Sequence, residues 1–167
     1  MVTGIEMKCF SEPWDRLSFE TSVKADHDIG IIAEYDGVPA GFCILRCSYE
    51  QADVINVAVS PHVRRKGIAA SMLKQLILEG RKCGVSDFLL EVRISNEPAV
   101  KLYEKLGFIT ISTGSSSSLY IISNGRPGAI ILNAFTTLAR PFGPIIVSGS
   151  VLSALPIDNN NPGRPLI

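Results

Sequence analysis

The chain has 167 residues, which is room for one ordinary domain or for a small domain with an appendage. Its 16 basic side chains balance its 16 acidic ones, which argues against a general nucleic-acid coat and against a protein that binds anionic membranes. At this length about two-thirds of the unfolded chain's surface can be buried, so the fold requires neither a disulfide nor a metal.

The four cysteines stand in no metal-ligand pattern, because Cys43 and Cys47 have neither a second cysteine pair nor a nearby histidine. No signal-peptide pattern opens the chain, so we expect reduced thiols, a cytoplasmic location and no bound metal. Cys43 and Cys47 are interpreted as small apolar strand residues, and His27 and His62 as isolated surface residues. These features argue against secreted disulfide scaffolds and zinc modules.

Charged residues are concentrated in the first two-thirds of the chain. Residues 1–112 hold 13 basic and 15 acidic side chains, whereas residues 113–167 hold three arginines and one aspartate. The longest uncharged run, residues 141–157, contains prolines and is shorter than the roughly 20 residues of a membrane span. We therefore expect one domain over residues 1–133 and a poorly ordered tail, rich in Pro, Gly and Asn, over residues 134–167.

Three strands are expected first in the chain. Residues 29–35 and 40–47 are apolar, β-rich runs separated by a turn that contains Asp36-Gly37. Asp-Gly between two such runs is a strong hairpin signal, so we expect this pair to be antiparallel. Residues 54–59 are apolar enough to form a central strand, which Ser60-Pro61 ends.

Two helices follow, with one strand between them. Apolar residues recur at helical spacing over residues 67–83, and residues 88–92 read as a fourth strand. Pro98 suits the first turn of a helix that runs to residue 106 and stops at Gly107. This order predicts an α/β (α+β) domain in which helices flank a mixed central sheet.

The segment between the third strand and the first helix is rich in basic and small residues. The first backbone N–H groups of a helix lack internal partners and carry the positive end of the helix dipole. Gly67, Ala69 and Ala70 leave that backbone open, so a diphosphate fits there, and the basic residues 64–66 add charge. The alternative is a solvated basic turn. The segment has neither a Walker A pattern nor a dinucleotide-binding Gly-x-Gly-x-x-Gly.

The sequence Arg-Arg-Lys-Gly-Ile-Ala at residues 64–69 resembles the Arg/Gln-x-x-Gly-x-Gly/Ala signature that binds acetyl-coenzyme A in the GNAT acyltransferases. The same family has an apolar strand, then Asn, then a helix with Leu-Tyr-x-x-x-Gly-Phe. Residues 88–92, Asn96 and residues 102–108 match this order. The resemblance implies the GNAT acyl-CoA N-acyltransferase fold, with acetyl-CoA as co-substrate and no metal.

Within this superfamily the sequence is most similar to the ribosomal-protein alanine N-acetyltransferases (RimI type). Residues 9–14, 55–59 and 90–96 carry the similarity, which covers roughly residues 5–112. The resemblance implies an enzyme that acetylates a protein or peptide N-terminus, such as that of a ribosomal protein. It also implies a monomer or weak dimer without a nucleic-acid or membrane partner.

The resemblance also assigns residues to the cofactor. The backbone of Val57 and Val59 is expected to pair with the pantetheine arm as an added strand would, and an N–H of that strand would polarise the thioester carbonyl. Asn96 is expected to hold the cofactor from the far side. The complete expected set is Val57, Ala58, Val59, Arg64, Arg65, Lys66, Gly67, Ile68, Ala69, Ala70 and Asn96.

The family's catalytic residues match Glu91 as general base and Tyr103 as general acid. Apolar neighbours are expected to shield Glu91 from water and make it a better base. The alternative for Glu91 is an edge carboxylate paired with Arg93 or a lysine, and for Tyr103 it is simple packing on a helix face. Acetyl transfer needs both roles, because the amine must lose a proton and the leaving thiolate must gain one.

On the acceptor side the resemblance points to Trp14 and Tyr120. Trp14, with Phe10, is interpreted as core or as a wall of the substrate groove, and Tyr120 as the family's substrate-side tyrosine. An N-terminal α-amine suits one modest carboxylate base, since it titrates about 2.5 units below a lysine amine and needs about 3 kcal/mol less for deprotonation. This property permits α-amine substrates and does not exclude other amines.

The sequence departs from its relatives at both ends. Only eight residues precede Cys9, so the family's first strand is expected to be missing, and residues 113–133 are a diverged form of the last hairpin. Such departures are expected of a fragment or an altered copy, and they favour cofactor binding over turnover. The alternatives are therefore a small-molecule amine acetyltransferase and a non-catalytic module that binds acetyl-CoA or a partner.

Overall fold

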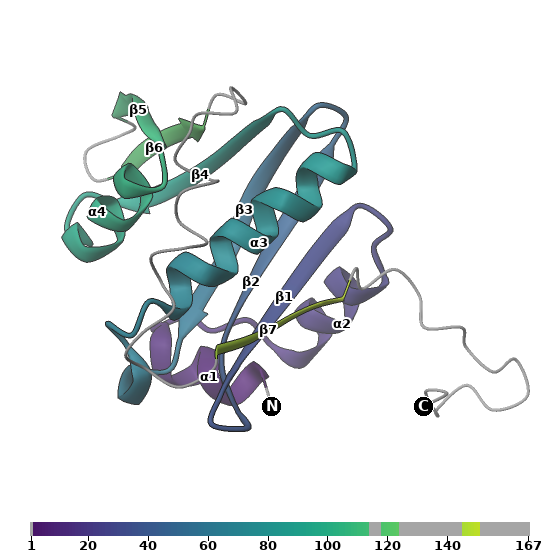
Figure 1. Ribbon diagram of the computed structural model, residues 1–167, viewed down its shortest axis with the longest axis vertical. Coiled ribbons are helices and arrows are strands. Elements are labelled where there is room, and N and C mark those ends of the chain that lie inside the picture. The colour runs from purple at the N-terminus through teal and green to yellow at the C-terminus, as the bar shows by residue number, and fades with distance from the viewer. Residues whose placement is uncertain (1, 114–117, 124–144, 151–167) are drawn as a thin grey trace, which may run out of the picture.

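The computed structural model describes residues 2–113, 118–123 and 145–150 (Figure 1). The helices are α1 (Val2–Cys9), α2 (Arg16–Lys24), α3 (Ile68–Lys82) and α4 (Glu97–Lys105), with a 3-10 turn at Pro61–Val63. The strands are β1 (Asp28–Tyr35), β2 (Val38–Ser48), β3 (Gln51–Val59), β4 (Asp87–Arg93), β5 (Ile109–Thr113), β6 (Ser118–Ser123) and β7 (Ile145–Ser150). The four strands and two helices expected over residues 29–106 are confirmed, whereas α1 and α2 were not predicted.

The strands form one mixed sheet in the order β5-β6-β4-β3-β2-β1-β7. β3 and β4 are parallel, and each of the other neighbouring pairs is antiparallel. α3 is the crossover between the two parallel strands, which cannot be joined by a tight turn. Figure 1 shows α3 lying along one face of the sheet. The expected α+β architecture, a mixed sheet flanked by helices, is confirmed.

The turn between β1 and β2 has the backbone that its sequence predicts. Asp36 has a φ of 53° and Gly37 a φ of 73°, so both central residues are left-handed. A two-residue hairpin turn of this kind needs two positive φ angles, and Asp-Gly is one of the few pairs that adopt them at low cost. The turn fixes the register in which Tyr35 pairs with Val38.

Each face of the sheet has its own core. On one face, α3 and α4 pack Met72, Leu76 and Tyr103 against strand residues that include Leu45 and Phe88. On the other face, α1 and α2 cover a smaller cluster of Ile5, Phe42, Ile44 and Ala58, with Trp14 and Phe19 packed against it. The sheet therefore separates two helical layers, and the candidate site lies where two of its strands diverge between them.

Close packing of α3 on the sheet depends on Gly80. A Cβ atom at Gly80 would lie 2.7 Å from Cε1 of Phe88 and 2.8 Å from Cδ2 of Leu45. Both neighbours are completely buried, so neither can move aside without disturbing the core. The glycine thus sets how closely the crossover helix approaches β2 and β4.

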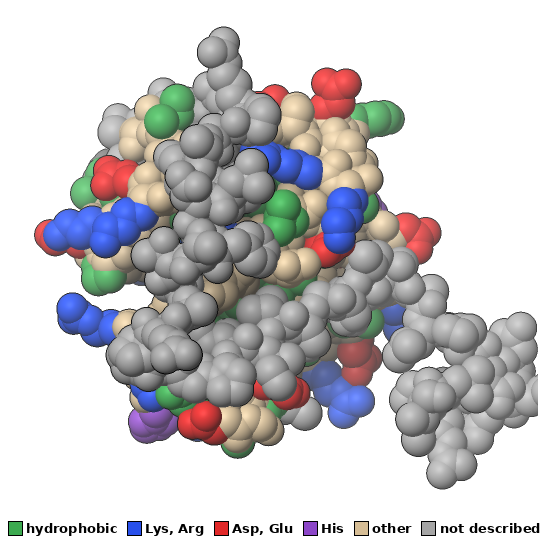
Figure 2. All heavy atoms as spheres, viewed as in Figure 1, with side chains coloured by type: hydrophobic (Ala, Val, Ile, Leu, Met, Phe, Trp, Pro, Cys, Tyr) green, Lys and Arg blue, Asp and Glu red, His purple; other side chains and the backbone are tan. Residues whose placement is uncertain are grey.

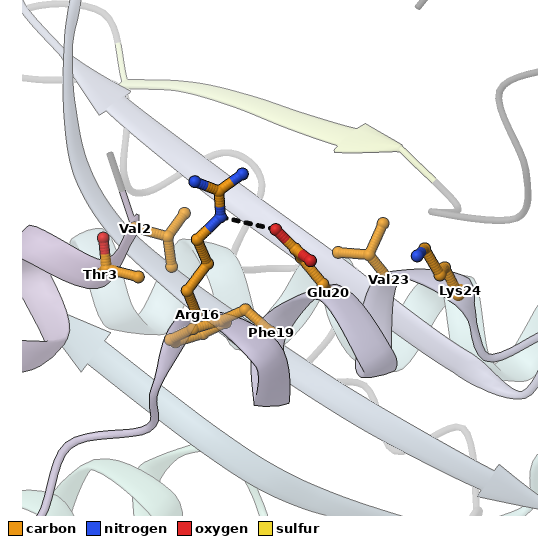
Figure 3. Close-up of a pocket in the computed structure, with 7 residues that line it drawn as sticks. All are labelled: Val2, Thr3, Arg16, Phe19, Glu20, Val23 and Lys24. Carbon is orange, nitrogen blue, oxygen red and sulfur yellow. Dashed lines mark hydrogen bonds and ion pairs between the residues drawn. The ribbon is translucent and has the colours of Figure 1, made fainter. Parts of the chain in front are cut away.

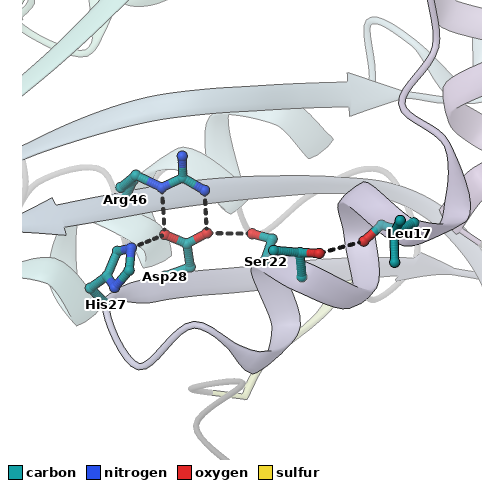
Figure 4. A network of polar contacts seen from close by, with 6 residues as sticks. Leu17, Ser22, His27, Asp28 and Arg46 are labelled. Atoms are coloured by element: carbon teal, nitrogen blue, oxygen red, sulfur yellow. Dashed lines mark hydrogen bonds and ion pairs between the residues drawn. The ribbon is translucent and has the colours of Figure 1, made fainter.

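A buried carboxylate anchors the start of β1 (Figure 4). Arg46 on β2 donates to Asp28 through two nitrogens, at 2.9 and 2.8 Å, and the hydroxyl of Ser22 on α2 donates at 2.5 Å. Burial would raise the pKa of Asp28, but the hydrogen bonds from Arg46 and Ser22 and the charge of Arg46 outweigh it and lower that pKa. The network therefore ties α2, β1 and β2 together.

β7 occupies the outer edge of β1. Its residues pair antiparallel with β1, from Ile145 opposite Tyr35 to Ser150 opposite Gly30. Residues 145–150 thus differ from the sequence expectation, which placed all of residues 134–167 in a poorly ordered tail. The domain boundary at residue 133 stays a prediction. Within the described residues no strand precedes Asp28.

On the face seen in Figure 2, basic and acidic side chains are interspersed rather than gathered in separate patches.

His27 and His62 are exposed, as expected. Cys43 is buried in β2, and Cys47 is half-buried. Among the helices that the structure describes, none has the length and apolar character needed to cross a bilayer.

Candidate active site

The parallel strands β3 and β4 pair over only part of their length. Gln51, Ala52 and Asp53 pair with Asp87, Phe88 and Leu89, and no later pair joins the two strands in the described residues. Residues 54–59 and 90–93, here called the fork, therefore diverge. The backbone groups that β3 turns toward β4 are unpaired there, so an extended ligand can add to β3 as a strand would.

A β-bulge in β3 accounts for the divergence. The pairing of β2 with β3 shifts register between Leu45 opposite Val54 and Ile44 opposite Asn56, which leaves Ile55 as the extra residue. A bulge bends its strand and increases the local twist. β3 consequently turns away from β4 at the point where their pairing has just ended.

The N-terminal half of α3 lies next to the last residue of β3, since Met72 and Val59 both lie against Gly41. Gly67 has a φ of 83° and is the N-cap of the helix, and Arg65 also has a positive φ, of 64°. The first intrahelical bond runs from the N–H of Ser71 to the carbonyl of Gly67 at 3.0 Å. The N–H groups of the first turn therefore have no acceptor within the helix, as an anion site requires.

The basic residues before α3 do not all face this helix end. Arg64 donates through Nε to the carbonyl of Val59 at 3.0 Å, and Lys66 donates to the Tyr35 hydroxyl at 3.0 Å and lies over the Tyr35 ring at 4.1 Å. Arg65 is exposed. The ammonium of Lys66 is thus held by Tyr35, and the assignment of residues 64–66 to a diphosphate stays a prediction.

The remaining cofactor candidates offer backbone rather than side chains. Val57 and Val59 are half-buried in the core on the α3 face, whereas the side chain of Ala58 is buried in the core on the opposite face. Ile68 is 2% exposed and anchors α3, while Ala69 and Ala70 are half-buried. Asn96 caps α4 with an exposed side chain that makes no capping hydrogen bond, so its amide is available to a ligand.

Glu91 and Tyr103 lie on opposite faces of β4. Leu90 and Val92 are buried in the core that also contains Tyr103, and Glu91, between them in a strand, projects from the other face. The fork therefore has a carboxylate on the α1–α2 side and a phenol on the α3–α4 side. This arrangement suits a base and an acid that act on two different reactants.

The carboxylate of Glu91 is exposed rather than shielded. The expectation that apolar neighbours shield it is wrong, because Leu90 and Val92 point to the other face of β4, and Leu89 on its own face leaves it exposed. Within the described part of the chain Glu91 has no ion-pair partner, and Arg93 is exposed as well. A water-accessible carboxylate can take a proton directly or through one water molecule.

Tyr103 is 8% exposed and packs edge-on against Phe108, with the ring centroids 5.8 Å apart. Burial, with a smaller contribution from Cys43, raises the pKa of Tyr103 to about 12. The phenol thus keeps its proton throughout the physiological range. Its burial also matches the alternative interpretation of an aromatic packed on a helix face.

Of the two acceptor-side candidates, Trp14 is half-buried and packs against Phe19, with ring centroids 5.4 Å apart. It is thus part of the core on the α1–α2 side. Tyr120 on β6 stands directly opposite Glu91 in the register of β4 and β6. The backbone therefore brings these two sequence candidates to neighbouring positions.

Two functional candidates were missed by sequence reasoning. Glu6 on α1 and Asn56 on β3 are polar yet only 1% and 7% exposed, and their side chains are hydrogen-bonded to each other. The signal available for Asn56 was a single amide inside the otherwise apolar run of residues 54–59. A lone glutamate such as Glu6 is ordinarily a solvated side chain, so it gave no signal.

Two surface hollows flank α1. The first, of about 430 Å³, lies between α1 and α2 and is lined by Val2, Thr3, Arg16, Phe19, Glu20, Val23 and Lys24 (Figure 3). The second, of about 460 Å³, includes Lys8, Tyr35, Ser60 and His62 near the basic turn. Neither hollow includes a residue assigned to catalysis or to the cofactor.

The comparisons with known proteins agree with this geometry. The ribosomal protein bS18-alanine N-acetyltransferase of Escherichia coli K12 is 33% identical to this chain over 128 residues. The match covers 77% of this chain and 84% of that protein. The crystal structure of the ribosomal-protein-S18-alanine N-acetyltransferase from Escherichia coli superposes with a TM-score of 0.63 at 31% identity, over 72% of this chain and 81% of that one.

A more distant structure shares the fold alone. The PaiA N-acetyltransferase from Thermoplasma acidophilum in complex with coenzyme A has a TM-score of 0.58 at 17% identity, covering 74% of this chain and 88% of that one. The family model described as acetyltransferase (GNAT) family matches residues 1–108. With its mixed sheet, its crossover helix and this match over most of the described residues, the chain belongs to the GNAT family of acetyltransferases.

Proposed function

We propose that this protein transfers the acetyl group of acetyl-CoA to the N-terminal α-amine of a protein, with a ribosomal protein as the acceptor. The observation that carries the proposal is the fork, because Val59 at its end and Met72 of α3 both lie against Gly41, which puts the fork next to the helix whose first N–H groups have no acceptor within it. The similarity to a bS18-alanine N-acetyltransferase over 77% of the chain supports the choice of acceptor.

Bound acetyl-CoA supplies the acetyl group as a thioester. The N–H groups that follow Gly67 suit its diphosphate, because they are unpaired donors at the positive end of a 15-residue helix. Among the described residues nothing pairs with the edge of β3 around Val57 that faces β4, which suits the pantetheine arm, and the side chain of Asn96 at the start of α4 makes no capping hydrogen bond. The residues present therefore fit the group.

The two proton transfers take place on opposite faces of β4. Glu91 accepts a proton from the attacking amine on the α1–α2 side, as the new N–C bond forms and the C–S bond breaks. Tyr103 donates its phenolic proton to the departing sulfur on the α3–α4 side. An α-amine is already about a tenth neutral at pH 7, so a single exposed carboxylate is a sufficient proton acceptor.

The test is acetyl transfer measured by mass spectrometry. The protein is incubated with acetyl-CoA and a peptide that begins with alanine, and in parallel with a polyamine and an aminoglycoside. Acetylation of the peptide α-amine is the expected result. Transfer only to the small amines would identify a small-molecule acetyltransferase instead. Calorimetric binding of coenzyme A without any acetylated product would identify a non-catalytic module.

A further inference from the structure

The α1–α2 face of β3 carries a buried polar cluster that the proposed chemistry does not use. Asn56 on β3 donates through Nδ2 to Oε1 of Glu6 on α1 at 3.1 Å. The backbone N–H of Trp14 donates to the same oxygen, also at 3.1 Å. One carboxylate oxygen therefore connects α1, the segment before α2, and β3, across 50 residues of sequence.

The polar cluster makes the fold less stable than an apolar core of the same shape would. Oε2 of Glu6 and Oδ1 of Asn56 are both buried, and neither has a hydrogen-bond partner among the described residues. A buried acceptor without a donor is destabilising, whereas apolar side chains of the same shape would fill this space without that penalty. A polar pair kept at such a place points to a role beyond filling the core.

The position of Asn56 indicates which part of β3 the polar cluster keeps in place. Asn56 follows Ile55, the extra residue of the bulge, and lies three residues beyond Asp53, where pairing with β4 ends. A bulged strand can relax by a change of register, which would move every later side chain to the other face. The bond to Glu6 fixes the face on which Asn56 stands, and with it the direction in which β3 leaves β4.

We infer that Glu6 is a positioning residue: by holding Asn56 against α1 it fixes the bent course of β3 and therefore the geometry of the fork. Its kinetic consequence rests on the proposed function, because residues 57–59 must then be aligned with the cofactor. Its structural consequence, the order of β3 beyond the bulge, is measurable without turnover.

Three variants of the full chain separate positioning from packing. Glu6→Leu removes the acceptor of both N–H donors while keeping a similar volume. Glu6→Gln keeps an acceptor for these donors and adds an N–H donor that suits Oδ1 of Asn56. Ile5→Ala, at the neighbouring buried position of α1, is the control that loosens the same core without touching the polar cluster.

The unfolding temperature of each variant is measured first. Amide hydrogen exchange of residues 55–59, coenzyme A affinity and the kinetic constants are then measured well below that temperature. Glu6→Leu is expected to increase exchange of residues 57–59 and to lower kcat/KM about tenfold or more, because small displacements at a reacting centre are costly. Glu6→Gln is expected to stay within about threefold of the parent protein. Ile5→Ala is expected to lower the unfolding temperature without either effect.

Equal behaviour of Glu6→Leu and Ile5→Ala in exchange and in kcat/KM would overturn the inference and leave Glu6 a packing residue. If Glu6→Leu does not fold, Asn56→Ala replaces it, since that change leaves the bond between Glu6 and Trp14 in place; unaltered exchange of residues 57–59 would then overturn the inference. A parent protein that acetylates no amine would contradict the proposed function instead, and the exchange result would still decide the role of Glu6.

Discussion

Asp53 on β3 and Leu89 on β4 are the last residues at which these two parallel strands pair. Beyond them a bulge at Ile55 turns β3 away, and the first turn of α3 comes to lie beside the diverging strand. The fork therefore brings unpaired strand backbone and unpaired helix N–H groups to the same place. A long ligand with an anionic part and an amide-bearing arm is the chemistry that such a place suits.

Replacing Glu91 by glutamine should lower kcat far more than it weakens coenzyme A binding. The change removes the proton acceptor and leaves the cofactor contacts alone, and general base catalysis contributes about 10²- to 10⁴-fold to a rate. Steady-state kinetics and calorimetry measure the two effects. Glu104→Gln, an exposed glutamate on α4, is the control. Equal losses in rate and affinity would remove Glu91 from the role of base.

Much of this fold follows from local signals in the sequence. Asp36-Gly37 specifies its turn because few other residues adopt two consecutive positive φ angles, and the apolar periodicity of residues 68–82 reports a helix that buries one face. These features depend on residues near each other in the chain, so a sequence pattern contains them.

Features set by distant residues were not predictable in the same way. Tyr35 captures the ammonium of Lys66 from a hairpin 31 residues upstream, and no local pattern reports that contact. The exposure of Glu91 depends on which face of β4 it occupies. Pairing of residues 145–150 with β1 depends on an edge that only the assembled sheet creates, and those residues carry no charge pattern that marks them as a strand.

Gly67→Val should weaken coenzyme A binding by about tenfold or more, because a β-branched residue resists a φ of 83° and would crowd the helix N-terminus. Gly84→Val is the matched control, since Gly84 follows the other end of α3 with a φ of 92° and open space around it. Both changes impose backbone strain on one helix. Calorimetry that finds equal affinity for the two variants would refute the diphosphate site.

Tyr103→Phe should reduce kcat by about a hundredfold while leaving the core packed, because only the hydroxyl is lost. The raised pKa of about 12 also predicts an alkaline effect on stability. A tyrosine whose pKa is higher folded than unfolded stabilises the fold below pH 10, and up to about 3 kcal/mol of that stability is lost as the pH rises toward 12.

Denaturant unfolding of the parent protein and of Tyr103→Phe between pH 9 and about 12 measures the alkaline effect. The phenylalanine variant should show the flatter dependence. A parallel decline in both proteins would contradict the burial of the phenol, and an unchanged kcat would make Tyr103 a packing residue alone.

Asp28 should make the fold sensitive to acid. Its pKa is lowered in the folded state, so the stability it contributes is complete above the ordinary value of 3.8 and is lost as the pH falls through the folded value. Asp28→Asn should cost about 2 kcal/mol at pH 7, an amount moderated by the partly exposed Arg46. Thermal melts between pH 2 and 7 should show that the unfolding temperature of the variant falls less steeply toward acid pH than that of the parent protein. An identical fall in both proteins would exclude the Asp28 network as the cause of the acid sensitivity.

Proline scanning of β7 should reveal whether it completes the sheet. Consecutive residues of a strand direct their N–H groups to opposite sides, so one of Val147→Pro and Ser148→Pro must remove an N–H that faces β1. That variant should unfold at lower temperature and show faster amide exchange in β1, and the other serves as its control. Full protection of β1 in both variants would show that this edge is held by something other than residues 145–150.

The most direct measurement is a titration of acetyl-CoA into isotopically labelled protein, with backbone amide signals followed by nuclear magnetic resonance. The largest shifts should fall on residues 57–59 of β3, on residues 67–70 at the start of α3 and on Asn96 at the start of α4. Shifts confined to the hollow between α1 and α2, or the absence of saturable shifts, would contradict the assignment of the fork as the acetyl-CoA site.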